Sequence, residues 1–356
     1  MDLTVERRDL RDAVRGLIAR DTSPWRRLCD EIGVAGLAIP DRYGGAGAGL
    51  AEICVVMEEL GRNLTPAPLL GSAVLAASAV QACGDAEACE RLLPAIADGS
   101  AIAALAWTTR AGHWDVAEVG YRARDAGGRW ELDGEAHYVL DGAAADILLI
   151  AASAPDGSTG LFEVDPRGDG VARAAVTAMD ASRDLAVVRL TGAPGRRIGG
   201  DAAGPLAFAR DQACVALSAE QAGAAKRALE LTVGHLLTRV QFGQVIGGFQ
   251  ALQHRAADLY VLVESARSLS RAAASAADEA GADSDPDRGP RAAAAKVYCS
   301  EVLTKTANEM IQLHGAIGIT WEHRAHRYLK RAHGGRYLFG SPARHLAAIA
   351  ANLIDR

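Results

Sequence analysis

The clearest candidates for chemistry lie in Arg239-Val240-Gln241-Phe242-Gly243 and in the segment after it, which contains Phe249 and Gln250. An arginine guanidinium can bind two phosphate oxygens at once, whereas a lysine offers only a point charge. Arg239 and Phe242 therefore place a phosphate-binding charge and an apolar face close together. Taken alone, Arg239 would be interpreted as a solvated charge on a helix, so the rest of the pattern has to decide its role.

A second candidate is Gln312-Leu313-His314-Gly315-Ala316-Ile317-Gly318-Ile319-Thr320-Trp321-Glu322, which follows a long helical pattern. Its glycines indicate a turn that ends a helix, because glycine adopts positive φ at little cost. The same turn would let the backbone at Gly315 and Ala316 approach a phosphate-bearing ligand closely. Ending a helix and contacting a ligand are compatible roles for these two residues.

The composition is that of an ordinary globular protein with room for two or three packed units. The chain has 356 residues, of which 49% are hydrophobic and 23% are charged, and its formal net charge is −6. This charge argues against a dedicated nucleic-acid binder. The first residues are charged and lack the apolar core of a signal peptide, and no apolar run is long enough to span a bilayer. We expect a cytoplasmic protein.

Six cysteines are scattered through the chain without the short spacings that are typical of metal ligands. We expect them to be reduced, buried thiols and expect no metal site. They are Cys29, Cys54, Cys83, Cys89, Cys214 and Cys299.

Three regions with different hydrophobic patterns indicate an α+β fold. Residues 1–99 have apolar stripes at helical spacing, and one stripe ends at Gly61, which suits the C-terminus of a helix. Residues 100–204 contain short alternating or apolar runs between turn residues, which predict a compact antiparallel β domain or barrel. Residues 205–356 are alanine-rich and helical, which predicts a bundle of long helices. Within them, the acidic stretch 278–290 is expected to be a solvated interhelical loop.

The order of these regions and motifs resembles the acyl-CoA dehydrogenase family over almost the whole chain. Ile39-Pro40…Tyr43-Gly44-Gly45, Glu58-Glu59-Leu60-Gly61 and Asp146-Ile147-Leu148-Leu149-Ile150 also match that family. The resemblance implies an N-terminal helical domain, a middle antiparallel β domain, a C-terminal four-helix bundle and FAD as the cofactor. It further implies an acyl-CoA substrate, an electron-transfer flavoprotein as redox partner, and an oligomer in which one subunit contacts its neighbour's FAD.

The resemblance assigns cofactor contacts to both motifs and to the β region. The implied cofactor-binding residues are Arg239, Gln241, Phe242, Phe249, Gln250, Gln312, Gly315, Ala316 and Thr108. Thr108 begins the stretch that in the family reads Thr-Glu-Pro-Gly-x-Gly-Ser-Asp, but here Trp114 occupies the serine position. A family Trp-x-Thr that touches the flavin ring appears as Tyr138-Val139-Leu140, and leucine lacks the hydroxyl donor. His113 in the same loop has no visible carboxylate partner and is interpreted as incidental.

The catalytic base is missing at both of its usual positions. The family's reaction needs a carboxylate that removes the Cα proton while Cβ transfers hydride to the flavin. The usual glutamate before a Gly-Thr pair corresponds to Phe339, and the alternative position upstream of Arg239 corresponds to Ala213. Asp211 is the nearest acid, but two residues turn a helix by about 200°, and Asp211 also suits the N-terminal part of a helix. Glu220 is interpreted as half of a buried structural pair.

Two main functional hypotheses stay open after these substitutions, beside an unrelated flavin role such as acyl-thioester oxidation in a biosynthetic pathway. The first is an independent acyl-CoA dehydrogenase, in a homo-oligomer, with Asp211 or another acid as a relocated base. The second is a partner subunit without independent catalysis, which works in a hetero-oligomer with an active homologue. The pattern resembles the base-lacking subunits of heteromeric acyl-CoA dehydrogenases from actinobacterial steroid degradation, in which one subunit lends interface residues to the other's FAD.

Overall fold

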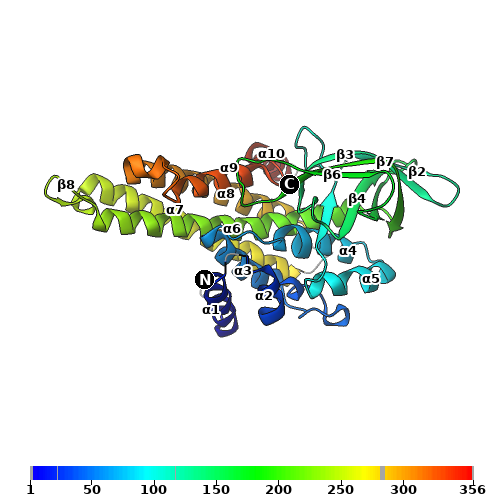
Figure 1. The fold of residues 1–356 in the computed structure, drawn as a ribbon, viewed down its shortest axis with the longest axis horizontal. Coiled ribbons are helices and arrows are strands. Elements are labelled where there is room, and N and C mark those ends of the chain that lie inside the picture. The colour runs from blue at the N-terminus through cyan, green and yellow to red at the C-terminus, as the bar shows by residue number, and fades with distance from the viewer. Residues whose placement is uncertain (1–2, 22, 117, 281–284, 355–356) are drawn as a thin grey trace.

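The computed structural model describes residues 3–21, 23–116, 118–280 and 285–354, in the order helical, β, helical. A long helical bundle lies along the longest axis of the molecule, and the β domain lies at one end of it (Figure 1). The N-terminal helices pack along the flank of the bundle and below the β domain. The three-part α+β fold predicted from the hydrophobic periodicity is confirmed.

The N-terminal region consists of helices joined by tight turns. Its helices are α1 (Val5–Ile18), α2 (Trp25–Arg27), α3 (Leu50–Asn63), α4 (Ala77–Ala82) and α5 (Ala86–Ala97). Short π and 3-10 segments complete it: η1 (Leu28–Ile32), η2 (Val34–Gly36), η3 (Asp41–Tyr43) and η4 (Leu69–Ala76). The apolar stripe of α3 is buried, as its helical spacing predicts.

Two glycines bring α3 against α6 (Ala203–Thr238), the first helix of the bundle. The sequence pattern predicts that Gly61 ends a helix, but α3 continues to Asn63. A Cβ atom at Gly61 would lie 2.0 Å from the carbonyl oxygen of Glu220, and one at Gly223 would lie 2.0 Å from that of Glu58. The glycines are therefore needed where the backbones of the two helices meet.

The β domain is a closed sheet with a mixture of strand directions. Its strands are β1 (Ala103–Ala106), β2 (Tyr121–Asp125), β3 (Trp130–Leu140), β4 (Ile147–Ser153), β5 (Thr159–Val164), β6 (Val171–Ala175) and β7 (Leu185–Ile198). The path β4-β2-β3-β7-β5 returns to β4, so these strands form a barrel. Most neighbouring pairs are antiparallel as predicted, but β4 pairs in parallel with both β1 and β2. Hairpin signals alone do not reveal these longer connections.

The C-terminal region is dominated by long helices. They are α6, α7 (Gln250–Ala280), α8 (Arg288–His314), α9 (Ala325–Tyr337) and α10 (Pro342–Ile354). The prediction that a loop begins at Asp278 is wrong, because α7 includes this residue and its carboxylate accepts hydrogen bonds from the N–H groups of Leu50 and Ala51. Residues 281–284 of the predicted loop lie outside the described residues, and none of the described helices is both long and apolar enough to cross a bilayer.

Candidate functional site

The Arg239–Gly243 motif forms a β-hairpin at the far end of the bundle, away from the β domain (Figure 1). Helix α6 ends at Thr238, and β8 (Val240–Gln241) pairs with β9 (Gln244–Val245). Phe242 and Gly243 form the turn with φ angles of 52° and 78°, the left-handed pair that two-residue hairpins favour. A 3-10 turn, η5 (Ile246–Gly248), then leads into α7, so the helix resumes only at Gln250.

The hairpin side chains predicted to bind the cofactor face solvent. Phe242 is 93% exposed, and its ring meets Phe249 edge to face with the centroids 6.2 Å apart. The side chains of Arg239 and Gln250 are exposed and form no hydrogen bond or ion pair with a described residue. The amide of Gln241 donates to the carbonyl of the adjacent Val240 at 2.8 Å. These groups are therefore free to contact something outside the described chain.

The second motif lies at the same end of the bundle. Helix α8 ends at His314, and Gly315 follows with a φ of 64°, so the predicted helix-terminating turn is confirmed. Gln312 is exposed on the last turn of α8, and Ala316 is exposed in the 3-10 segment η6 (Gly315–Ile319).

Three stacked histidines join the two motifs. The ring of His235, near the end of α6, lies 4.5 Å from the ring of His314, and His314 lies 4.3 Å from His323. Burial lowers the pKa of all three imidazoles, and the neighbouring imidazoles lower those of His235 and His323 further. The structure thus brings eight of the nine predicted cofactor-binding residues to one end of the bundle. The contact between the three histidines was not predicted from the motifs.

Thr108 is separated from the other predicted cofactor residues. It follows β1, which pairs with β4 in the β domain at the opposite end of the bundle. Thr108 is 2% exposed, and its carbonyl accepts a hydrogen bond from the N–H of His137 at 2.9 Å. One chain therefore cannot use Thr108 and the Arg239 hairpin for the same cofactor molecule.

An aromatic cluster surrounds Phe339, the residue that the resemblance assigns to the usual base position. Phe339 packs edge to face on Trp114 at 5.0 Å, and Trp114 packs edge to face on Trp107 at 5.2 Å. The three residues are 1%, 5% and 0% exposed, so there is no accessible space around their rings. The sequence shows Trp114 and Phe339 as two separate departures from the family pattern; the structure shows that they are in contact. The sequence pattern does not predict a role for Trp107. Its position directly before Thr108 is the one sequence feature that could have indicated its part in this cluster.

The alternative base position is equally unsuited to proton removal. Ala213 is completely buried in α6, which is continuous there, so Asp211 has no irregularity that would turn it toward that position. Asp211 lies well inside the helix rather than in its first turn, and it pairs with Arg210 at 3.3 Å and Arg288 at 3.5 Å. Burial raises the pKa of Asp211, and the two guanidinium groups oppose this rise.

Glu220 belongs to a buried ion network that links the β domain to the C-terminal bundle. Its carboxylate accepts hydrogen bonds from Arg183 of the β domain at 2.6 Å and from Arg331 of α9 at 2.8 Å. Arg331 also pairs with Asp180 at 2.8 Å. Burial alone would raise the pKa of Glu220, but the two arginines outweigh it and hold the pKa below its usual value. The structural role predicted for Glu220 fits this network.

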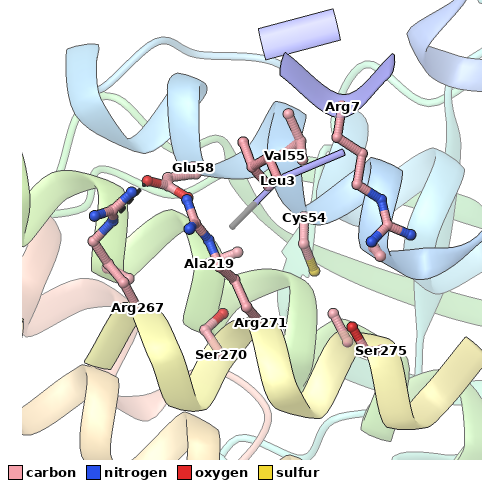
Figure 2. A pocket seen from close by; sticks show the side chains of 13 residues that line it. Leu3, Arg7, Cys54, Val55, Glu58, Ala219, Arg267, Ser270, Arg271 and Ser275 are labelled. Atoms are coloured by element: carbon pink, nitrogen blue, oxygen red, sulfur yellow. Dashed lines mark hydrogen bonds and ion pairs between the residues drawn. The ribbon is translucent and has the colours of Figure 1, made fainter. Parts of the chain in front are cut away.

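A second ion network holds α3 against α7 and contains Glu58. Arg267 and Arg271 both donate to its carboxylate, at 2.9 and 3.1 Å, beside a narrow pocket between α3, α6 and α7 (Figure 2). The space in this pocket is about 30 Å³, enough for a water molecule rather than a substrate. The family-like Glu58-Glu59 pair therefore has a structural explanation, and Glu59 similarly accepts from Arg15 at 2.6 Å.

The other side chains considered for chemistry do not form a site. His113 does have a carboxylate neighbour, because its Nδ1 lies 2.6 Å from Glu118, but both side chains are substantially exposed. All six cysteines are free thiols, and only Cys83 is less than fully buried. Within the described ranges, no group of three or more histidine, cysteine, aspartate or glutamate side chains could hold a metal ion.

The fold and the motifs place the chain in a known class. Its residues 4–100 match the model of the acyl-CoA dehydrogenase N-terminal domain, and residues 210–354 match that of the acyl-CoA dehydrogenase C-terminal domain. The chain belongs to the acyl-CoA dehydrogenase family, a family of oxidoreductases.

Several members of this family are similar to the chain over nearly its whole length. Acyl-CoA dehydrogenase IpdE2 of Mycobacterium tuberculosis (strain ATCC 25618 / H37Rv) is 38% identical, and the match covers 95% of this chain and 94% of IpdE2. Among solved structures, the Tcur3481-Tcur3483 steroid ACAD G363A variant superposes with a TM-score of 0.88 at 31% identity and covers 98% of each chain. The ChsE4-ChsE5 complex from Mycobacterium tuberculosis superposes with a TM-score of 0.90 at 27% identity over the full length of both chains.

Proposed function

We propose that this chain is the non-catalytic subunit of a heteromeric, FAD-dependent acyl-CoA dehydrogenase. The observation that carries the proposal is the aromatic cluster. Phe339 stands where the base would be and is packed against Trp114 and Trp107, with no accessible space between the rings. Such a site has no acid to remove a proton and no room for a flavin ring beside Thr108.

The end of the bundle that carries the Arg239 hairpin and Gly315, here termed its free end, has residues that suit a flavin dinucleotide presented by another subunit. The Arg239 guanidinium is exposed, forms no ion pair with any described residue, and suits a pyrophosphate. Gly315, with its positive φ, lets a ligand approach the backbone, and Phe242 offers an exposed apolar ring. Bound FAD would accept the hydride at the catalytic subunit, while the residues of this chain would bind and orient the cofactor.

The similar proteins support a heteromeric assembly. The ChsE4-ChsE5 and Tcur3481-Tcur3483 structures are named as pairs of different chains, and the second is named a steroid ACAD. By analogy, the partner of this chain is a homologue that retains the glutamate. The substrate of the complex would be a steroid-derived acyl-CoA thioester, and an electron-transfer flavoprotein would reoxidise the flavin.

The competing hypothesis is an independent enzyme with a relocated base. Asp211 is its only named candidate, and the pairing of Asp211 with Arg210 and Arg288 gives that hypothesis no support. The two hypotheses differ in the flavin content of the isolated chain. Stoichiometric FAD that is bleached by an acyl-CoA would establish the independent enzyme and overturn the proposal.

The positive test uses the chain co-expressed with a homologue that carries the glutamate. We expect one FAD for each pair of unlike subunits, measured by flavin absorbance against protein concentration. Arg239→Gln should weaken FAD retention by about tenfold or more, because a hydrogen bond to a charged group contributes roughly 1.5–3 kcal/mol. The matched control is Arg122→Gln, which removes an exposed arginine from β2 in the β domain. Equal FAD loss in both variants would remove the assigned role of Arg239.

A further inference from the structure

A cavity of about 360 Å³ lies where the N-terminal helices, the β domain and the bundle meet. Cavities of this size at domain junctions are common small-molecule sites when an apolar wall carries a few polar groups. None of the three rings of the aromatic cluster lines it. Its apolar wall includes Trp25, Met57, Leu60, Ala67, Leu70, Ile102 and Leu140.

The polar wall contains two carboxylates with no hydrogen-bond or ion-pair partner among the described residues, those of Asp141 and of the exposed Asp184. Asp141 follows β3 with a φ of 56°, and no described residue donates a hydrogen bond to its side chain. The carboxylate fits because the facing residue is a glycine: a Cβ atom at Gly71 would lie 2.6 Å from its Oδ2. Burial raises the pKa of Asp141 to about 7, and Arg183 only partly opposes the rise. The Asp141 side chain is partly exposed at the cavity wall, so a ligand in the cavity could supply the hydrogen-bond donor that the described chain does not.

The other charges around the cavity disfavour a charged ligand. The guanidinium groups of Arg183 and Arg331 both donate to Glu220, which offsets their charge, although Nε of Arg183 has no hydrogen-bond partner among the described residues. Asp184 adds a further exposed negative charge to the lining. A cation would meet the two guanidinium groups, and an anion would meet three carboxyl groups. A hydroxyl group suits Asp141 best, because it can donate to the ionised carboxylate and accept from the protonated acid.

We propose that this cavity binds an uncharged, largely apolar molecule whose hydroxyl group hydrogen-bonds to the side chain of Asp141. The site is separate from the free end of the bundle, where the Arg239 hairpin lies. It therefore does not depend on the partner-subunit role, and it can be tested without FAD or a second subunit.

The test is calorimetric titration of the full-length chain with three ligands that share one apolar cage. These are 1-adamantanol, adamantane-1-carboxylate and 1-adamantylamine, which differ only in the charge of the polar group. We expect the alcohol to bind and each charged ligand to bind at least tenfold more weakly. Asp141→Ala should weaken binding of the alcohol by about tenfold, because the lost hydrogen bond involves a charged or acidic group.

A pair of neighbouring alanines provides the control for location. Ala144 is exposed and lines the cavity, whereas Ala143 is exposed and does not. Ala144→Phe should therefore abolish binding of 1-adamantanol, and Ala143→Phe should leave it unchanged. Both changes are at exposed positions, so folding is expected to survive them. Failure of all three ligands to bind, tighter binding of a charged one, or equal effects of the two alanine variants would each overturn the proposal.

Discussion

Phe242-Gly243 and Phe339-Gly340 share an unusual backbone but have opposite surroundings. In both pairs the phenylalanine adopts a left-handed conformation, with φ of 52° and 60°, and the glycine that follows also has a positive φ. Phe242 is 93% exposed at the free end of the bundle, whereas Phe339 is 1% exposed beside the β domain. Local sequence and local geometry are therefore the same in kind, and only the tertiary environment makes one ring a contact residue and the other a packing residue.

The two phenylalanines also mark two ends of the molecule with different properties, an exposed contact surface and a packed core. The free end of the bundle has exposed side chains, such as Arg239, that have no partner in the described part of the chain, as an interface requires. The other end has its aromatic rings packed together and Glu220 paired with two arginines, as a stable core requires. Changes at the buried end should therefore affect folding, and changes at the free end should affect assembly.

The largest effect is expected when the buried ring is removed. Phe339→Ala should lower the free energy of unfolding by about 3–5 kcal/mol, because it deletes the ring packed against Trp114 and leaves a cavity. Urea denaturation followed by circular dichroism measures the loss. Phe339→Leu is the matched control, since it retains part of the volume with the same backbone strain, and it should cost less. A loss below about 1 kcal/mol for the alanine variant would show that the cluster is not a well-packed core.

Acid should destabilise the same buried end through His345. Burial lowers the pKa of His345 from an ordinary value of 6.5 to about 4, and its Nε2 faces Gly340. Below pH 6.5 the unfolded chain binds the proton more readily, so the free energy of unfolding falls as the pH decreases from 6.5 to 4. The shift corresponds to about 3 kcal/mol.

His345→Leu removes this titration and is the variant for the test. The pH dependence of unfolding between neutrality and pH 4 should be shallower in the leucine variant than in the unchanged chain by about that amount. Denaturant titrations at several pH values provide the measurement. Parallel pH profiles for the two proteins would contradict the assignment of this acid sensitivity to His345.

The smallest effect on folding is expected for the exposed ring. Phe242→Ala should change the free energy of unfolding by less than about 0.5 kcal/mol, as is usual for exposed side chains. In the co-expressed complex it should weaken subunit association by about tenfold, because aromatic residues often dominate interfaces. Analytical ultracentrifugation of the complex measures the association. Strong destabilisation of the isolated chain by Phe242→Ala would break the distinction between the two ends.

The three-part fold could be predicted because periodicity is local. The apolar stripe of α3 and the helical pattern of residues 205–356 both depend on residues close in sequence. The hairpin at Phe242-Gly243 was harder to predict, because a turn of two left-handed residues usually carries Asn or Gly in the first position.

The candidate site could be predicted only in part, because its contacts are distant in sequence. The sequence shows that Trp114 and Phe339 differ from the family pattern, but their contact depends on how the β domain docks on the bundle. The stacking of His235 on His314 likewise depends on the lengths of α6 and α8. The partner of Glu220 could not be named, because Arg183 and Arg331 come from two other parts of the chain.

Helix α6 connects the two ends without interruption over 36 residues, which is roughly 54 Å at 1.5 Å per residue. Residues so far apart share no neighbours, so substitutions at one end have nearly additive effects with those at the other. A gene copy could accordingly accumulate changes that abolish its own turnover while selection preserved the distant contact surface. Because this single helix is so long, the two ends of the subunit can change independently during evolution. A duplicated subunit that no longer catalyses a reaction can therefore still be required for the activity of its homologous partner.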